Sequence, residues 1–177
     1  VEIACSGTLA KCVKRGDKVI VCHASTGNLG HVVIPPDELT KIRAEEAKKA
    51  GGLAGIEVIG GMFDDLNIFD GNKAARDKLV DVIKYAQPDF IITHNPDDYM
   101  PDHTAVSRLV FDASFAATLP NYKSRYEKAA ALVPIYYMDT LAGVDFQPTE
   151  YVDISAEIGL KLKMLNCHES QLVWMKE

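Results

Sequence analysis

Hydrophobic and polar positions follow two periods along this chain, one typical of helices and one typical of buried strands. Apolar residues three or four apart predict helices, and short apolar runs predict strands covered on both faces. The predicted helices cover residues 3–15, 37–51, 73–86, 104–118 and 156–167. The predicted strands cover residues 18–22, 56–59, 90–93 and 135–138. Because strands and helices alternate, we predict an α/β fold with a mainly parallel sheet and helices on both of its faces.

Turn and cap residues fit these elements. Gly16 is placed to end the first helix, and Asp37 is placed to cap the second. Residues 119–131 form the one segment in which we expect a flexible excursion. Without an internal repeat or a low-complexity linker, residues 1–177 are expected to form one domain. Because the chain opens directly on a predicted helix, we expect the natural protein to extend further at its amino end, and its carboxyl end is a second place for an extension.

Composition and charge narrow the function classes. The net charge of −6 is spread along the chain without a run of Lys or Arg, so neither nucleic acid nor an anionic membrane is the expected partner. A small or neutral ligand fits better. The sequence has no apolar run long enough to cross a bilayer, and no charged-then-apolar stretch precedes the first predicted helix, so we expect neither export nor membrane insertion. The four cysteines lack a Cys-x-x-Cys spacing, which favours a reducing cytoplasm.

The most informative stretch is residues 94–103, which directly follow the apolar residues 89–93. Pro96 and Pro101 disfavour a helix or an interior strand, so we predict a turning loop at the end of a buried strand. Ligands of parallel sheets bind beyond the carboxyl ends of the strands. The loop contains two imidazoles and three carboxylates, namely His94, His103, Asp97, Asp98 and Asp102. Such nitrogen and oxygen donors are what a zinc or iron(II) site requires.

Each member of this loop also has a simpler interpretation. An isolated Pro-Asp-His segment is typical of an acidic turn, but His94 in the same loop shifts the balance toward a site. His103 stands at the start of a predicted helix, where a neutral imidazole can bind a metal, so it is the candidate metal ligand. Asp102 is placed either to cap that helix or to orient a neighbouring histidine.

A second polar loop, residues 25–31, follows the predicted strand at residues 18–22. Its residues either line a pocket for a polar ligand or serve only the turn, which is the commoner role of its glycines. Arg43 is either a donor to a ligand or a solvated charge on a helix surface. Asp64 and Asp65 present the same choice between a pocket and a solvated turn. A lone histidine such as His168 is more often structural than catalytic.

Several signatures of other enzyme classes are missing from the sequence. No Gly-x-Gly-x-x-Gly follows a predicted strand, and no Gly-x-x-x-x-Gly-Lys-Ser/Thr occurs. Dinucleotide binding and phosphate-loop chemistry therefore lack their glycine-rich turns, and a nucleotide-binding protein is disfavoured. A Gly-x-Ser-x-Gly nucleophile elbow is also absent.

With these motifs in this order, the chain resembles the zinc-dependent N-acetylglucosamine deacetylases of the LmbE-like, or PIG-L, family. The resemblance covers nearly the whole chain. It rests on Glu2, Cys5-Ser6-Gly7-Thr8-Leu9-Ala10, Thr26-Gly27, Gly30-His31, Arg43, Glu46-Ala47, Gly61, Asp64, residues 93–103, Val152-Asp153-Ile154-Ser155, His168 and Ser170-Gln171. It implies a Rossmann-like three-layer α/β sandwich.

The resemblance also implies roles for residues in the loop at 94–103. The family's first signature, His-Pro-Asp-Asp-x-Glu, supplies two zinc ligands and the general base, and this chain enters it only at Val1 and Glu2. The third ligand falls on His103. Met100 stands where many members have a histidine that stabilises the oxyanion or protonates the leaving group, and a thioether does neither. His94 is our candidate substitute and Tyr99 the next.

These inferences predict a metal-dependent hydrolase that removes an acetyl group from an amino sugar or its glycoconjugate. The expected cofactor is Zn²⁺, with Fe²⁺ as the alternative, and a small amino sugar is the expected partner. A homo-oligomer stays open. The predicted catalytic residues are Asp102 and His94, and the predicted substrate contacts are Asn28, Arg43, Asp64, Asp98 and Tyr99. The alternative is a non-catalytic carbohydrate-binding or regulatory domain of the same fold.

Overall fold

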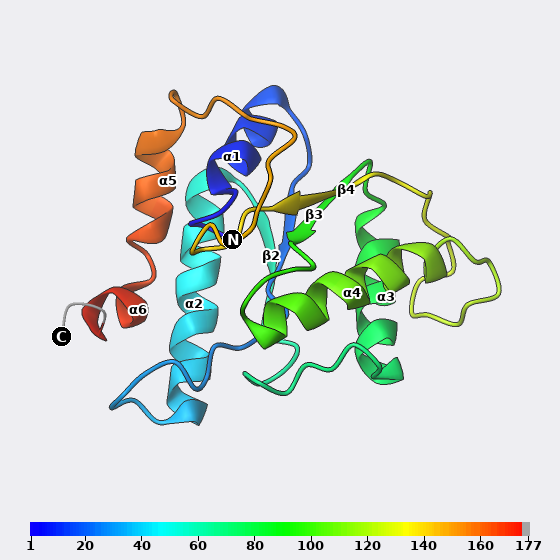
Figure 1. Cartoon of the computed structure of the whole chain (residues 1–177), viewed down its shortest axis with the longest axis horizontal. Helices are drawn as coiled ribbons and strands as arrows, with labels where there is room; N and C mark the ends of the chain where they lie inside the picture. Colours follow the sequence, from blue (N-terminus) through cyan, green and yellow to red (C-terminus); the bar gives the residue numbers. More distant parts are fainter. Residues whose placement is uncertain (175–177) are drawn as a thin grey trace. The chain divides into compact units, whose positions relative to one another are not determined.

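A computed structural model describes residues 1–174, which divide into two compact units. The first unit contains Val1–Asp65 and the segment that starts at Pro148, and the second contains Leu66–Gln147. Each unit combines helices with one pair of short parallel strands (Figure 1). The predicted α/β character is therefore confirmed, whereas the prediction of a single domain stays a prediction. Within the described part, no helix is both long and apolar enough to span a bilayer.

The first unit is built around one long helix. Its elements are α1 (Ser6–Arg15), β1 (Ile20–Cys22), α2 (Pro36–Ala54), β2 (Glu57–Ile59), α5 (Ile158–Leu165) and α6 (Glu169–Trp174). Helix α2 contacts β2, α5 and α6, and α1 contacts α5. Strand β1 pairs in parallel with β2, with Val21 opposite Val58. The apolar core of this unit includes Leu9, Ala10, Leu39, Ala47, Ala50 and Met164.

Close packing of α2 on β2 depends on a single glycine. A Cβ atom built on Gly51 would clash with Cγ2 of Val58. The next residue, Gly52, has nothing within 4 Å of the same position. The absence of a side chain at Gly51 therefore allows the helix to approach the strand.

The second unit places two helices against a strand pair. Its elements are α3 (Lys73–Ala86), β3 (Ile91–His94), α4 (Pro101–Ala116) and β4 (Ile135–Met138). Helix α4 contacts both α3 and β3. Strand β3 pairs in parallel with β4, with Thr93 opposite Tyr137 and His94 opposite Met138. The buried residues between these elements include Leu79, Val80, Ala105, Val106, Leu109 and Ala113.

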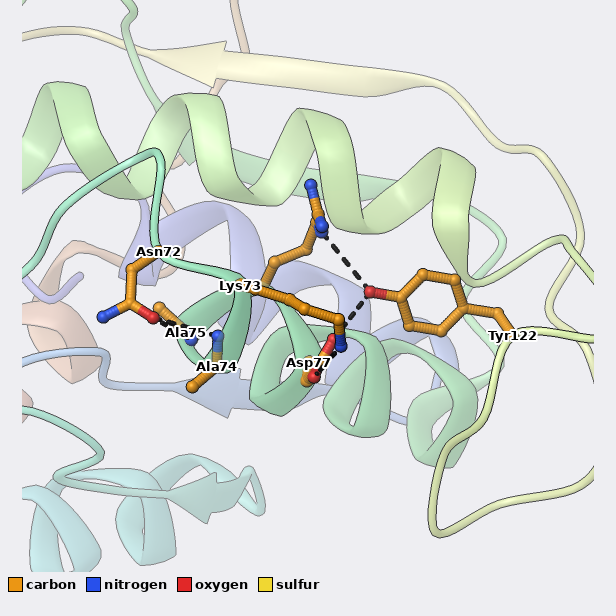
Figure 2. A network of polar contacts seen from close by, with 7 residues as sticks. Asn72, Lys73, Ala74, Ala75, Asp77 and Tyr122 are labelled. Atoms are coloured by element: carbon orange, nitrogen blue, oxygen red, sulfur yellow. Dashed lines mark hydrogen bonds and ion pairs between the residues drawn. The ribbon is translucent and has the colours of Figure 1, made fainter.

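The segment predicted to be a flexible excursion, residues 119–131, is bonded to α3. The Tyr122 hydroxyl donates to the carboxylate of Asp77 at 2.6 Å, and Figure 2 shows these two side chains facing each other. The same hydroxyl accepts from Nε of Arg76 at 3.3 Å. The carbonyl of Tyr122 accepts from Nζ of Lys84 at 2.9 Å. The segment lacks helices and strands, but polar contacts hold it to the helix.

Some predicted boundaries hold and others shift. Helix α3 has the predicted bounds, and the side chain of Asn72 caps it by accepting from two backbone amides. Gly16 ends α1 in the left-handed conformation, as predicted. The prediction that Asp37 caps α2 is wrong, because the helix already begins at Pro36 and Asp37 lies in its first turn. The final helix predicted for residues 156–167 is α5, and α6, which follows it, lies beyond the predicted range.

The most consequential shift concerns Pro101, which does not end the loop but begins α4. A proline fits the first turn of a helix, because the amide that it lacks has no partner within the helix there. Asp102 and His103 therefore lie on the first turn of α4 instead of on a loop. His94, likewise predicted on the loop, is the last residue of β3.

Candidate metal centre

Three side chains of the second unit gather where β3 ends and α4 begins. His94 is the last residue of β3, Asp98 lies in the connecting loop, and His103 lies in the first turn of α4. Each offers one metal-binding atom, and these atoms lie within 4.8 Å of one another. The sequence-predicted loop therefore brings two imidazoles and one carboxylate together.

Asp98 is held on both of its oxygens. Its Oδ2 lies 2.9 Å from Nδ1 of His103, and its Oδ1 accepts from the backbone amide of Met100 at 2.9 Å. Only 2% of its side chain is exposed. Burial raises the pKa of Asp98, but the hydrogen bonds from Met100 and His103 outweigh this effect and hold the pKa below its usual range. Asp98 is therefore a carboxylate near neutral pH.

The imidazole of His94 is stacked on that of His103. Their ring centroids lie 3.8 Å apart, and the ring planes differ by 17°. Burial, with a smaller contribution from the charge of His103, lowers the pKa of His94 to about 3. The His94 ring is therefore neutral near pH 7, where it has one N–H donor and one lone pair.

The chemistry of these donors fits a divalent zinc or iron ion. Imidazole nitrogen and carboxylate oxygen are ordinary ligands of both metals. The side chain of His103 is 24% exposed, so an ion can reach it from solvent. Its Nδ1 is engaged by Asp98, which leaves Nε2 as the atom for a metal.

Other residues of the predicted loop have different positions. Asp102 accepts from the backbone amide of Leu66 through Oδ2 at 2.8 Å, so its carboxylate joins the start of α4 to the first residues of the second unit. Tyr99 is half exposed. Met100 precedes α4 and makes no side-chain cap. The catalytic role of Asp102 and the substrate contact of Tyr99 stay predictions.

A cavity of about 460 Å³ opens in the second unit and is lined in part by Pro96, two residues beyond His94. Phe111 and Tyr137 give it aromatic walls. Asp112 lines it as a carboxylate, and a second carboxylate, Asp70, is paired at 3.0 Å with Arg108. The lining is therefore partly aromatic and carries more negative than positive charge.

In the first unit, Arg43 organises the polar loop after β1. Its Nη1 donates to the carbonyl of Gly27 at 2.5 Å, and its Nη2 donates to the carbonyl of Gly30 at 2.7 Å. Burial lowers the pKa of the half-buried guanidinium. Arg43 is thus not the solvated helix-surface charge of the simpler interpretation. Its contact with a substrate stays a prediction.

Asp64 and Asp65, for which a pocket and a solvated turn were both open, have different positions in the structure. Asp65 accepts from the backbone amides of Gly27 and Leu29 at 3.1 and 3.0 Å, and from the hydroxyl of Ser25. Asn28 accepts from the amide of Asp65 at 3.0 Å through Oδ1. Asp65 therefore closes the loop.

Asp64 is exposed next to this closed loop. The substrate contacts predicted for Asn28 and Asp64 stay predictions.

Two buried pairs that the sequence did not reveal join distant parts of the first unit. Oε1 and Oε2 of Glu46 accept from the amide and the hydroxyl of Ser170, both at 2.7 Å. Nε2 of His168 lies 3.4 Å from Oε1 of Glu2. Burial is the largest single effect and raises the pKa of Glu2, but the hydrogen bond with His168 and the nearby positive charges together outweigh it and lower the pKa to about 2. These pairs agree with a structural role for His168.

Comparison with known families gives a match over most of the chain. The model for "PIG-L: GlcNAc-PI de-N-acetylase" matches residues 1–114, a range that includes the whole cluster of His94, Asp98 and His103.

Curated relatives extend the similarity beyond that range. Diacetylchitobiose deacetylase from Thermococcus kodakarensis is 28% identical over 97% of this chain and 67% of its own length. A 4-oxalmesaconate hydratase from Pseudomonas putida is 25% identical over 90% of this chain and 69% of its own length. The chain thus spans about two thirds of each relative, and the two relatives carry different activities.

A solved structure supports the fold. The N,N'-diacetylchitobiose deacetylase from Pyrococcus horikoshii superimposes with a TM-score of 0.81 and 24% identity over 96% of this chain and 66% of that one. At this identity the similarity concerns the fold.

Proposed function

The chain belongs to the PIG-L, or GlcNAc-PI de-N-acetylase, family, and we propose from this premise that it is a metal-dependent hydrolase that removes an acetyl group from an amino sugar or its glycoconjugate. The observation that carries the proposal is the cluster of His94, Asp98 and His103 within the matched residues. Similarity to a diacetylchitobiose deacetylase supports the substrate class. We further propose that residues 1–177 belong to one domain with a Rossmann-like three-layer sandwich.

His103 is the residue of this cluster that would hold the metal through Nε2. Zinc, or iron in its place, supplies Lewis acidity and brings the pKa of a coordinated water close to neutrality. The other ligands and the general base of the family belong to the His-Pro-Asp-Asp signature, of which this chain shows the last positions, Val1 and Glu2.

The proposed reaction is hydrolysis of an acetamide. The oxygen of a water molecule bonds to the acetyl carbon, the bond from that carbon to nitrogen breaks, and a proton from water moves to the nitrogen. The second proton of that water leaves the acetic acid and protonates the amine, so acetate and the ammonium form of the amino sugar are the products near neutral pH. Each hydrogen-bond donor aimed at the developing oxyanion typically lowers the activation free energy by about 3 kcal/mol.

His94 supplies such a donor in our proposal. Its neutral ring carries one N–H, whereas Met100, at the family's histidine position, has no proton to donate. A neutral imidazole is suited to hydrogen bonding to an oxyanion and poorly suited to protonating the amine. Asp102 holds the first turn of α4 in place through Leu66.

The cavity beside Pro96 supports a neutral sugar over an anionic substrate. Aromatic walls such as Phe111 and Tyr137 suit the apolar face of a sugar ring, and carboxylates accept hydrogen bonds from hydroxyls. The carboxylates of Asp70 and Asp112 in the lining would repel a substrate with several carboxylates. Asn28, Arg43, Asp64 and Tyr99 remain predicted sugar contacts, whereas Asp98 belongs to the cluster of the candidate metal centre.

Two other functions are alternatives to the deacetylase. A hydratase is favoured by the similarity to the 4-oxalmesaconate hydratase, which is nearly as close as the deacetylase. A non-catalytic carbohydrate-binding domain is favoured by Met100. A homo-oligomer and a reducing cytoplasm also stay predictions.

The test uses the protein that contains this chain, loaded with zinc. Acetate release is measured from N,N'-diacetylchitobiose and N-acetylglucosamine, and loss of substrate is measured with 4-oxalmesaconate. We expect acetate release that falls more than about 100-fold in His103→Gln, because the metal is then lost. Turnover of 4-oxalmesaconate alone would favour the hydratase. Sugar binding without any turnover would favour the non-catalytic domain.

A further inference from the structure

The stacked arrangement of His94 and His103 limits which of the clustered groups can bind one metal ion together. The lone pair of an imidazole nitrogen lies in the plane of its ring, so a bound ion lies close to that plane. The two ring planes are 17° from parallel, with centroids 3.8 Å apart. An ion in the plane of His103 therefore lies well out of the plane of His94. As arranged, the two histidines are not ligands of the same ion.

The distance between Asp98 and His103 also indicates a hydrogen bond. Two donor atoms on one tetrahedral zinc ion lie roughly 3.4 Å apart, given zinc–nitrogen and zinc–oxygen distances of about 2.1 Å. Oδ2 of Asp98 and Nδ1 of His103 are 2.9 Å apart, the usual length of an N–H···O bond. Since a carboxylate only accepts, the hydrogen lies on Nδ1 of His103.

The orientation of Asp98 is fixed independently of His103. The backbone amide of Met100 donates to Oδ1, directly before the first residue of α4, and leaves Oδ2 turned toward the imidazole. With 2% of the side chain exposed, water does not compete strongly for these bonds. The carboxylate thus has one backbone partner and one imidazole partner.

From this geometry we infer that Asp98 is a positioning residue, which holds His103 in the Nδ1–H tautomer so that its Nε2 lone pair faces the metal. This inference rests on the proposed function, because it concerns the same metal centre. It replaces the predicted contact of Asp98 with a substrate. Carboxylates that orient metal-binding histidines in this way typically change metal affinity by about 10–100-fold when they are substituted.

Asp98→Asn is the informative substitution. The amide oxygen of asparagine can keep the bond from the Met100 amide, and its NH₂ group then faces Nδ1 of His103 as a donor. His103 would have to accept there and carry its hydrogen on Nε2, the atom that the metal needs. We therefore expect zinc affinity, measured by competition with a chelator, to fall by about 10–100-fold.

The control is Asp97→Asn, which removes the same charge from the exposed neighbouring residue. It should leave zinc affinity within about threefold of the unchanged protein, since exposed charges are screened. Circular dichroism and thermal unfolding of both variants identify a misfolded protein.

The second measurement needs no metal. Nitrogen chemical shifts of the imidazoles, with the His103 signals identified by their loss in His103→Gln, report which ring nitrogen carries the hydrogen. We expect Nδ1–H in the metal-free protein and a shift toward Nε2–H in Asp98→Asn. A His103 ring with its hydrogen on Nε2 in the unsubstituted protein would overturn the inference.

The outcomes separate the inference from the proposed function. If the protein releases acetate but Asp98→Asn changes neither zinc affinity nor the tautomer, the positioning role is wrong and the function stands. If Asp98→Asn has both predicted effects but no acetamide is hydrolysed, the positioning role stands and the function is wrong. Unchanged zinc affinity in His103→Gln would contradict both.

Discussion

At the scale of single residues, Arg43 shows how a side chain with a predicted binding role also holds the structure. Its guanidinium donates to two carbonyls of the loop after β1, and both bonds are charge-assisted. We expect Arg43→Ala to lower the free energy of unfolding by about 2 kcal/mol in urea titrations, because half-buried bonds of this kind contribute a little less than fully buried ones.

Lys41→Ala is the matched control for this prediction, because Lys41 is exposed on the same helix. It should change stability by less than about 0.5 kcal/mol. Equal stability of the two variants would show that Arg43 does not hold the loop.

Because its thiol is buried, Cys22 at the end of β1 should make the folding stability of the protein fall at alkaline pH. Burial raises the pKa of its thiol to about 11 from the ordinary value of 9.0. Between these values the unfolded chain loses the thiol proton and the folded chain keeps it, so folding stability falls as pH rises. Two pKa units correspond to about 3 kcal/mol at most.

The measurement compares urea unfolding of the unsubstituted protein and of Cys22→Ala at pH 8, 9 and 10. Cys22→Ala is expected to lose less stability over this range, because it has no thiol to titrate. Parallel curves for the two proteins would contradict the raised pKa. Lower intrinsic stability of the variant does not affect the result, which is the difference in slope.

At the scale of elements, adjacent glycines in α2 predict opposite effects of one substitution. An added methyl group at Gly51 would meet Val58 of β2, so Gly51→Ala should destabilise the first unit by about 1–3 kcal/mol. Gly52 faces open space, and Gly52→Ala should stabilise the helix by up to about 1 kcal/mol. Thermal unfolding of both variants tests the pair, and a stabilising Gly51→Ala would contradict the close approach of α2 to β2.

The same elements show what the amino-acid pattern can and cannot predict. Helix α3 has its predicted bounds, because its apolar positions are regularly spaced, and the structure adds the cap at Asn72. The start of α4 was missed, because Pro101 was interpreted as a breaker when its position at the first turn suits a proline. The spacing of apolar residues therefore predicts where a helix or strand lies better than it predicts where that element begins and ends.

The sequence likewise predicts some of the contacts at functional residues and not others. His94, Asp98 and His103 were found because they lie within ten residues, so their proximity is visible in the sequence. Glu46 and Ser170 are 124 residues apart, and no local pattern marks them as partners. The bond from Nδ1 of His103 to Asp98 was also missed, because composition predicts which polar groups are present and only coordinates show which atom faces which.

At the scale of the whole molecule, the proposed metal centre connects ligand binding to folding. A ligand that binds only the folded state stabilises it by about 2.7 kcal/mol when its free concentration is 100 times the dissociation constant. For a chain of this size that corresponds to a rise of roughly 5–10 °C in the midpoint of thermal unfolding. We expect zinc to produce this rise and EDTA to reverse it.

Histidines and cysteines of the unfolded chain also bind zinc, which makes the rise in the unfolding midpoint smaller. The test therefore compares the rise between variants. His103→Gln removes the proposed ligand but keeps the other donors, and zinc should then leave its midpoint nearly unchanged. Asp97→Asn keeps His103 and its partner Asp98, and should keep the full rise. An equal rise in all three proteins would place the zinc at donors other than His103, because only a site that does not use the His103 imidazole keeps its affinity when that imidazole is lost.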